Sequence, residues 1–361
     1  DVAKQRVLSS RLFYLTIFLG FSAAFLHALV APFVSAHIFH DSSLTHPMLI
    51  ISALIFLSLL FNTLLGIQRG LKRFKSYAYL EFFRQAFLIV LGIIFVVFLN
   101  YSVDGAIYAL VLSPLIPILL FLSRFPFLLE FGSAKSTASI TYRYILSYGA
   151  SLSLLGVILA SYMVADRFVL GFLQTKEAVG FYSVSSSIVL LGFAFVGSIK
   201  NAMFPYLSEI FAQVSTIKEK RFLHYFERMT TITLSFVGLF VLFVGVFSFQ
   251  LIRLLFGEQY IPAMPFLELM ILSLPFLTLY IYLHTFAIST HRVSKAVTAS
   301  GIALVLYFPI LYILTRTMGV TGTALAFVIG SAILAVLYSF FVLKGVRSVI
   351  TKPILLCLFI F

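Results

Sequence analysis

The sequence is short of charge and of cysteine. Only 10% of its 361 residues are charged, whereas 61% are hydrophobic and the mean hydropathy is +1.11. Soluble globular domains carry about 25% charged residues. The single Cys357 excludes an intrachain disulfide and a metal site built from several cysteines. We therefore exclude a soluble domain large enough to carry chemistry of its own and expect a chain embedded in the lipid bilayer.

The sequence also lacks the motifs of common enzymes. It contains no phosphate-binding P-loop and no motif of a nucleophilic hydrolase. Enzymes that use lipid-linked sugars need catalytic acids in a substantial outer loop, and the joints expected on the outer side are short. We expect no enzymatic activity, no cofactor and no metal ion.

Long apolar segments follow one another along almost the whole chain. A helix needs about 20 apolar residues to cross a membrane, and strands are excluded because lipid cannot satisfy their backbone groups. The pattern predicts an all-α, polytopic bundle of transmembrane helices. We expect ten spans and an eleventh that begins at Pro353: 12–38, 47–66, 77–99, 103–123, 144–170, 178–199, 229–255, 263–289, 296–315 and 320–343.

The formal net charge of +13 is distributed unevenly between the two sides of the predicted bundle. Of the 25 lysines and arginines, 21 lie before the first span or in alternate joints, and the others are Arg167, Lys176, Arg253 and Arg316. By the positive-inside rule, the beginning of the chain and the basic joints are cytoplasmic. The charge is therefore a topology signal, and we expect membrane lipid as a partner and no nucleic acid.

Two spans begin with a similar motif. Val103-Asp-Gly-Ala-Ile-Tyr-Ala-Leu-Val matches Val320-Thr-Gly-Thr-Ala-Leu-Ala-Phe-Val at an offset of 217 residues. Parallel repeats are common in transporters, although small residues spaced by four also recur where helices merely pack closely. If the motif reflects duplication, the chain has two pseudo-symmetric six-helix lobes, and two helices are missing before residue 1. We expect lobes at 1–135 and 136–348, followed by a further helix over 349–361.

Charged residues inside spans are expensive and commonly functional. Ser147, Ser151, Tyr162 and Asp166 fall on one face of the fifth predicted span, so this face is expected to meet protein or water. Asp166 and Tyr162 are candidates for a substrate or ion cavity, together with Ser151. The alternative is a local ion pair between Asp166 and Arg167.

A second candidate group is cationic. Arg84, Asn62, His284 and Lys200 are expected at similar depth on different spans and together form a candidate pocket for an anionic head group, since a guanidinium matches phosphate. The alternatives are an Arg84 pair with Glu81 on one helix surface and scattered anchors for lipid phosphates.

Glu268 is a further cavity candidate on the outer half of its span. It is also close in sequence to Arg253 and Glu258, which favours a charge cluster on the outer surface. Several prolines lie inside predicted spans, where each is expected to bend its helix: Pro114, Pro117, Pro265, Pro275 and Pro309.

Four runs in order resemble the polysaccharide-transporter family, which includes O-antigen flippases and belongs to the multidrug/oligosaccharidyl-lipid/polysaccharide exporter (MOP) superfamily. They are D-R-F-V-L-G at 166–171, A-V-G-F-Y-S-V-S at 178–185, N-A-M-F-P-Y-L-S at 201–208 and L-L-F-G-E-Q-Y-I-P-A at 254–263. The resemblance implies two six-helix lobes around a central cavity, with the first two helices absent from this chain.

The same resemblance implies an activity at the cytoplasmic (inner) cell membrane. A flippase of this family moves a polyprenyl-diphosphate-linked oligosaccharide from the cytoplasmic to the outer leaflet by alternating access, driven by a coupling ion such as H⁺ or Na⁺ or by the membrane potential. The alternative on the same scaffold is a cation-coupled multidrug antiporter. Arg84 and Lys200 favour an anionic cargo over a cationic drug.

Overall fold

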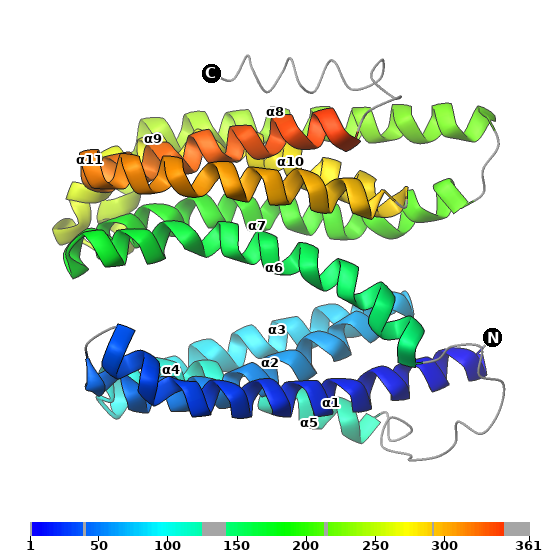
Figure 1. Ribbon diagram of the computed structural model, residues 1–361, viewed down its shortest axis with the longest axis horizontal. Coiled ribbons are helices and arrows are strands. Elements are labelled where there is room, and N and C mark those ends of the chain that lie inside the picture. The colour runs from blue at the N-terminus through cyan, green and yellow to red at the C-terminus, as the bar shows by residue number, and fades with distance from the viewer. Residues whose placement is uncertain (1, 39–40, 125–141, 213–215, 291, 343–361) are drawn as a thin grey trace. The chain divides into compact units, whose positions relative to one another are not determined.

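The computed structural model describes residues 2–38, 41–124, 142–212, 216–290 and 292–342 (Figure 1). Every regular element in these ranges is a helix, which confirms the predicted all-α class. The predicted helix over 349–361, with Pro353 and Cys357, lies outside the described residues.

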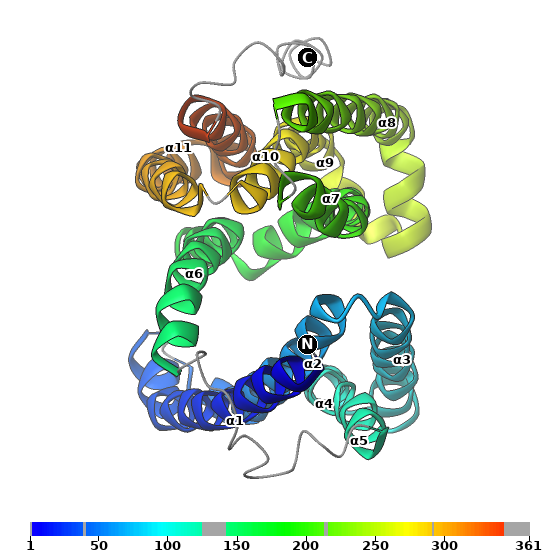
Figure 2. The same ribbon diagram turned by 90° about the vertical axis from the view of Figure 1, so that its right-hand side faces the viewer.

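The chain divides into two compact units, Asp1–Ile145 and Leu146–Phe361. The first unit contains α1, α2, α3, α4 and α5, and α2 contacts α1, α3 and α4. In Figures 1 and 2 these helices form one bundle. Their bounds are α1 Val2–Phe33, extended by a π-helical turn over Val34–Ile38, α2 Thr45–Gly70, α3 Phe74–Gly92, extended by a π-helical turn over Ile93–Phe98, α4 Ser102–Leu112 and α5 Leu115–Arg124.

The second unit forms a bundle of its own, and α6 (Tyr142–Leu173) supplies its first helix. Within it, α10 contacts α7, α8 and α11, and α9 lies against α7, α8 and α11. Its further elements are α7 Lys176–Ala212, α8 Thr216–Phe256, a 3₁₀ segment over Glu258–Ala263, α9 Met264–Ile271, α10 Ser273–Ser289 and α11 Val293–Val342. The assignment of 1–135 and 136–348 to two six-helix lobes stays a prediction.

The described helices agree with ten membrane spans. Eight are long and apolar enough to cross a bilayer, and α9 with α10 forms a ninth span bent by 44°. The longest, α11, has 50 residues and a non-helical break at Gly319, where φ is 60°. At 1.5 Å per residue it is far longer than a bilayer core of about 30 Å. The break at Gly319 turns the second arm of α11 back along the first. Thr315 and Thr323, one on each arm, show this, because their Oγ1 atoms lie 2.9 Å apart. The two arms are therefore two spans, which brings the number to ten.

Prolines break only some of the spans. The fourth predicted span divides into α4 and α5 at Ser113–Pro114, and the bend between α9 and α10 comes just before Pro275. The prediction that every proline bends its helix is wrong for Pro265, which occupies the first turn of α9. The N–H group of a residue in the first turn has no acceptor within the helix, so a proline at this position removes no backbone hydrogen bond.

The repeated motif plays the same structural role in both units. A Cβ atom added to Gly105 would lie 2.9 Å from the carbonyl oxygen of Phe95, and one added to Gly322 would overlap the carbonyl oxygen of Leu314. Both glycines therefore let the start of one span approach the end of the preceding span. This shared role supports the repeat, whereas duplication itself stays a prediction.

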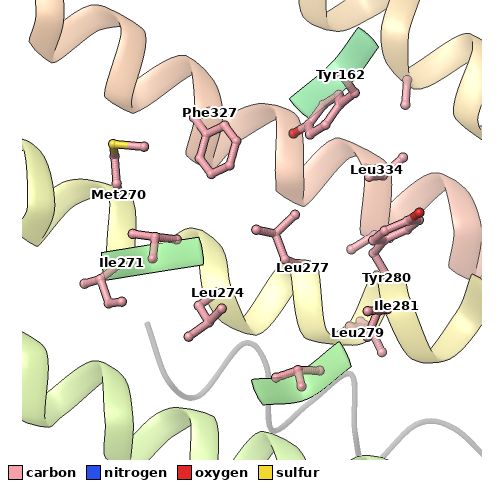
Figure 3. Packing of buried hydrophobic residues seen from close by; sticks show 14 of the residues in the cluster. Tyr162, Met270, Ile271, Leu274, Leu277, Leu279, Tyr280, Ile281, Phe327 and Leu334 are labelled. Carbon is pink, nitrogen blue, oxygen red and sulfur yellow. The ribbon is translucent and has the colours of Figure 1, made fainter. Parts of the chain in front are cut away.

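The core of the second unit is apolar and aromatic. Figure 3 shows Leu277 of α10 among residues of α11 and α6, including Phe327 and Tyr162. The Tyr162 and Phe327 rings are 6.3 Å apart. These contacts attach α6 to α11 and fix the position of the polar residues that α6 carries.

Candidate functional site

The first unit contains a polar pocket of about 460 Å³ between α2, α3 and α4. Along α2 the pocket extends from Leu54 to Arg69, roughly 22 Å at 1.5 Å per residue. Two arginines and one glutamate are the charged residues among its lining, so the pocket is net cationic. The lining consists of Leu54, Ser58, Phe61, Asn62, Leu65, Arg69, Tyr77, Glu81, Arg84, Leu110, Ser113 and Pro114.

Arg84 is held between α3 and α2. Its Nη2 donates to Oε1 of Glu81 at 2.5 Å, which confirms the predicted pairing on the surface of one helix. Its guanidinium carbon also lies 5.6 Å from the centre of the Phe61 ring, a cation–π distance. Within the described residues Arg84 makes no other hydrogen bond, so most of its five donors are available to a ligand.

The rest of the pocket offers further donors. Arg69 lies 5.5 Å from the centre of the Tyr77 ring. Asn62 and Ser58 form no side-chain hydrogen bond within the described part of the chain. A guanidinium binds phosphate or carboxylate bidentately, and hydroxyl and amide groups complete such sites. The pocket is therefore chemically suited to an oxyanion.

A second polar site lies in the other unit around Asp166 of α6. Asp166 is only 2% exposed, and the hydroxyl of Tyr182 on α7 donates to its Oδ2 at 2.5 Å. The other oxygen, Oδ1, accepts from the backbone N–H of Arg167. The predicted alternative, an ion pair between the two side chains, is wrong: the Arg167 guanidinium donates to Ser186 at 2.9 Å instead.

Two buried tyrosine hydroxyls near Asp166 have no hydrogen-bond partner among the described residues. Tyr162 and Tyr307 are 1% and 0% exposed, and their ring centres are 4.5 Å apart. Both are within electrostatic range of Asp166. Buried polar groups are normally paired, so these two hydroxyls retain unused capacity to bind a small polar species or ion beside a carboxylate.

The remaining predicted residues are dispersed over the second unit. His284 interacts electrostatically with Lys200 and lies 3.4 Å from the Tyr338 hydroxyl. Glu268 is exposed and accepts a hydrogen bond from Ser248 at 2.7 Å. Ser151 belongs to α6, but its side chain lies outside the described residues.

The predicted outer charge cluster forms only in part. Arg253 pairs with Glu258 at 2.6 Å, whereas Glu268 bonds Ser248 and does not join them. Arg84 and Asn62 share the pocket of the first unit. Their grouping with His284 and Lys200 stays a prediction.

Several residues that the sequence did not indicate belong to these two sites in the structure. Arg69 and Tyr77 line the pocket. In the sequence, Arg69 is only one of the basic residues of a joint, which indicate membrane topology. Tyr182 lies near Asp166 from the next helix, α7, and Tyr307 from α11. A tyrosine is not unusual in a span, so only the three-dimensional contact identifies them.

The family model described as "Polysaccharide biosynthesis protein" matches residues 3–265. The chain belongs to this family. The match covers most of the chain. With its several candidate membrane spans, the chain is a multi-pass membrane protein of this family. A search of curated proteins finds no match.

Solved transporters of the MOP superfamily share the fold of this chain. An outward-facing multidrug resistance MATE family transporter has a TM-score of 0.75 and 19% identity over 96% of this chain and 79% of its own. A MOP transporter from Pyrococcus furiosus has a TM-score of 0.77 and 18% identity over 97% and 80%. A mutant of the Vibrio cholerae MATE transporter VcmN has a TM-score of 0.71 and 16% identity over 95% and 82%.

Proposed function

We propose that this protein acts as a flippase that moves a polyprenyl-diphosphate-linked oligosaccharide from the cytoplasmic to the outer leaflet by alternating access. The observation that carries the proposal is the arginine-lined pocket of the first unit in a polysaccharide biosynthesis transporter. A diphosphate is a compact polyanion, and Arg84 and Arg69 are suited to bind it through paired hydrogen bonds.

The distribution of charge supports entry of the cargo from the cytoplasmic side. Arg69 lies at the end of α2 beside the basic turn to α3, and the positive-inside rule assigns this end of the pocket to the cytoplasm. In this proposal the protein lies in the cytoplasmic cell membrane. The pocket then accepts its cargo from the leaflet where lipid-linked sugars are assembled.

Asp166 is our candidate for the coupling site. A carboxylate that is 2% exposed in a membrane protein is expensive and commonly functional. Tyr162 and Tyr307 place two unpartnered hydroxyls nearby. A proton on the carboxylate or a bound Na⁺ would neutralise its charge and use these groups.

The alternative function is a cation-coupled multidrug antiporter, which the MATE neighbours favour through their fold. A cationic drug would meet Arg84 and Arg69 in the pocket, and like charges repel. The Pyrococcus furiosus transporter is described by the reverse polarity of its binding pocket, suggesting a different function. The same fold is therefore compatible with more than one pocket charge.

The test is complementation of a flippase-deficient strain by the full-length protein. We expect Arg84→Ala and Asp166→Asn to abolish complementation at unchanged protein levels. Arg316→Ala and Glu177→Gln are matched controls, because each removes the same kind of charge at an exposed position outside both sites. Full complementation by both site variants would refute the site assignment.

A further inference from the structure

Glu81 places a negative charge inside a pocket that otherwise suits an anion. It lines the pocket together with Arg84, and the two side chains are 32% and 26% exposed. Glu81 Oε1 accepts from Arg84 Nη2 at 2.5 Å and from Gln85 Nε2 at 3.2 Å. The carboxylate therefore occupies one of the positions that a phosphate oxygen would take on the guanidinium.

The contact across the pocket limits how far Arg84 can move. Phe61 of α2 faces the guanidinium from the neighbouring helix, at 5.6 Å from ring centre to guanidinium carbon. Glu81 is only three residues away on the same helix, and its long side chain can leave Arg84 by rotating about its own bonds. Arg84 thus keeps a partner on α2 when Glu81 leaves it, whereas both hydrogen-bond partners of Glu81, Arg84 and Gln85, lie on its own helix.

We propose that Glu81 is a displaceable counter-ion of Arg84, which the diphosphate group of the cargo replaces on binding. This inference rests on the proposed function. In the empty pocket the Glu81 carboxylate accepts a hydrogen bond from the Arg84 guanidinium and holds it in position. When a diphosphate binds, it takes the donors of Arg84, and Glu81 is released and repelled by the new negative charge.

The counter-ion has a consequence for transport. The carboxylate occupies one donor of Arg84 and, being negative, repels a diphosphate beside it, so each lowers the affinity of Arg84 for the other. Glu81 therefore weakens the binding of the cargo and helps the cargo to leave when the protein opens to the other side. A transporter gains nothing from holding its cargo too tightly, because release is part of its cycle.

The experiment measures binding of soluble diphosphates to the purified full-length protein in detergent at fixed salt concentration. Farnesyl diphosphate is the probe for a lipid-linked group and inorganic pyrophosphate the probe for the free anion, each titrated by calorimetry. An exposed or partly exposed ion pair is worth up to about 1 kcal/mol, equivalent to about fivefold in Kd. We expect Glu81→Gln to bind both probes about fivefold more tightly and to transport more slowly.

Three variants make the outcomes distinct. Glu177→Gln, a carboxylate exchange outside the pocket, should leave both affinities unchanged. Arg84→Gln should lose most of the binding. Glu81→Asp keeps the charge on a shorter side chain that reaches Arg84 less well, so it should show a smaller gain, and it replaces Glu81→Gln if that variant does not fold.

The results separate this inference from the proposed function. If the unmodified protein binds diphosphate through Arg84 but the Glu81 variants bind it equally or more weakly, the counter-ion is refuted and the anion pocket stands. If neither the unmodified protein nor the Glu81 variants bind either probe, the proposed function fails and the counter-ion with it. Tighter binding of pyrophosphate and farnesyl diphosphate alike supports recognition of the diphosphate, whereas a gain confined to farnesyl diphosphate contradicts it.

Discussion

Gly322 provides a sharp test of the hairpin formed by the two arms of α11. A Cβ atom at this position would overlap the carbonyl oxygen of Leu314, and it would lie 2.5 Å from the carbonyl carbon and 2.9 Å from Met318 Cβ. Carbon atoms in contact are normally about 3.5–4.0 Å apart. Because the nearest atoms belong to the backbone, Gly322→Ala forces the two arms of the hairpin apart.

The size of the effect follows from overpacking. Inserting a methyl group into a tightly packed position costs about 1–3 kcal/mol. Gly301 lies in the first arm of the same helix with nothing within 4 Å of a Cβ, so Gly301→Ala is the matched control. Alanine in a helix interior is favoured over glycine by about 0.5–1 kcal/mol, and the control should therefore be neutral or more stable.

The assay is thermal unfolding in detergent, followed by the size-exclusion profile of a fluorescent-protein fusion, since the chain has no tryptophan. A change of 1 kcal/mol shifts Tm by about 2–4 °C in a domain of this size. We expect Gly322→Ala to unfold several degrees below Gly301→Ala. Equal Tm values would show that the arms do not meet at Gly322 and would refute the hairpin geometry.

Two further predictions concern the other motif copy and the Asp166 site. Gly105→Ala should also lower Tm, because its Cβ would lie 2.9 Å from the Phe95 carbonyl group; a neutral result would remove the structural equivalence of the two motifs. Tyr182→Phe should destabilise the protein by about 1–3 kcal/mol, because it removes the hydrogen bond to a buried carboxylate. Tyr307→Phe removes a hydroxyl without a partner and should not lower Tm, although we expect it to reduce transport; equal losses of Tm in both variants would contradict this account of the site.

The helical spans were predictable because lipid leaves the backbone few choices. Continuous apolar runs and alternating basic joints placed the ten spans, and the run from 296 to 343 was correctly divided near Gly319. The sequence of a span does not show whether a proline lies in the first turn of a helix or elsewhere in the span. Pro265 and Pro114 look alike in the sequence, and only the true helix start distinguishes them.

The candidate sites were predictable only for their charged members. Asp166 and Arg84 stand out because a charge inside an apolar run is unusual. Their partners are not identified as such, since Tyr182 lies in the 178–185 run only as part of a family resemblance and Arg69 is one of many basic residues in joints. The contacts from Tyr182 to Asp166 and from Phe61 to Arg84 join helices that no local pattern relates.

We propose that the protein carries a diphosphate-linked glycan across a bilayer. The most direct measurement uses proteoliposomes with the full-length protein and a polyprenyl-diphosphate-linked oligosaccharide, whose exposure is followed with a membrane-impermeant glycosidase. We predict that the protected fraction of the glycan becomes accessible at a rate that depends on Arg84 and Asp166. If the glycan stays protected while the same vesicles transport a cationic dye, the flippase account is wrong and the multidrug antiporter takes its place.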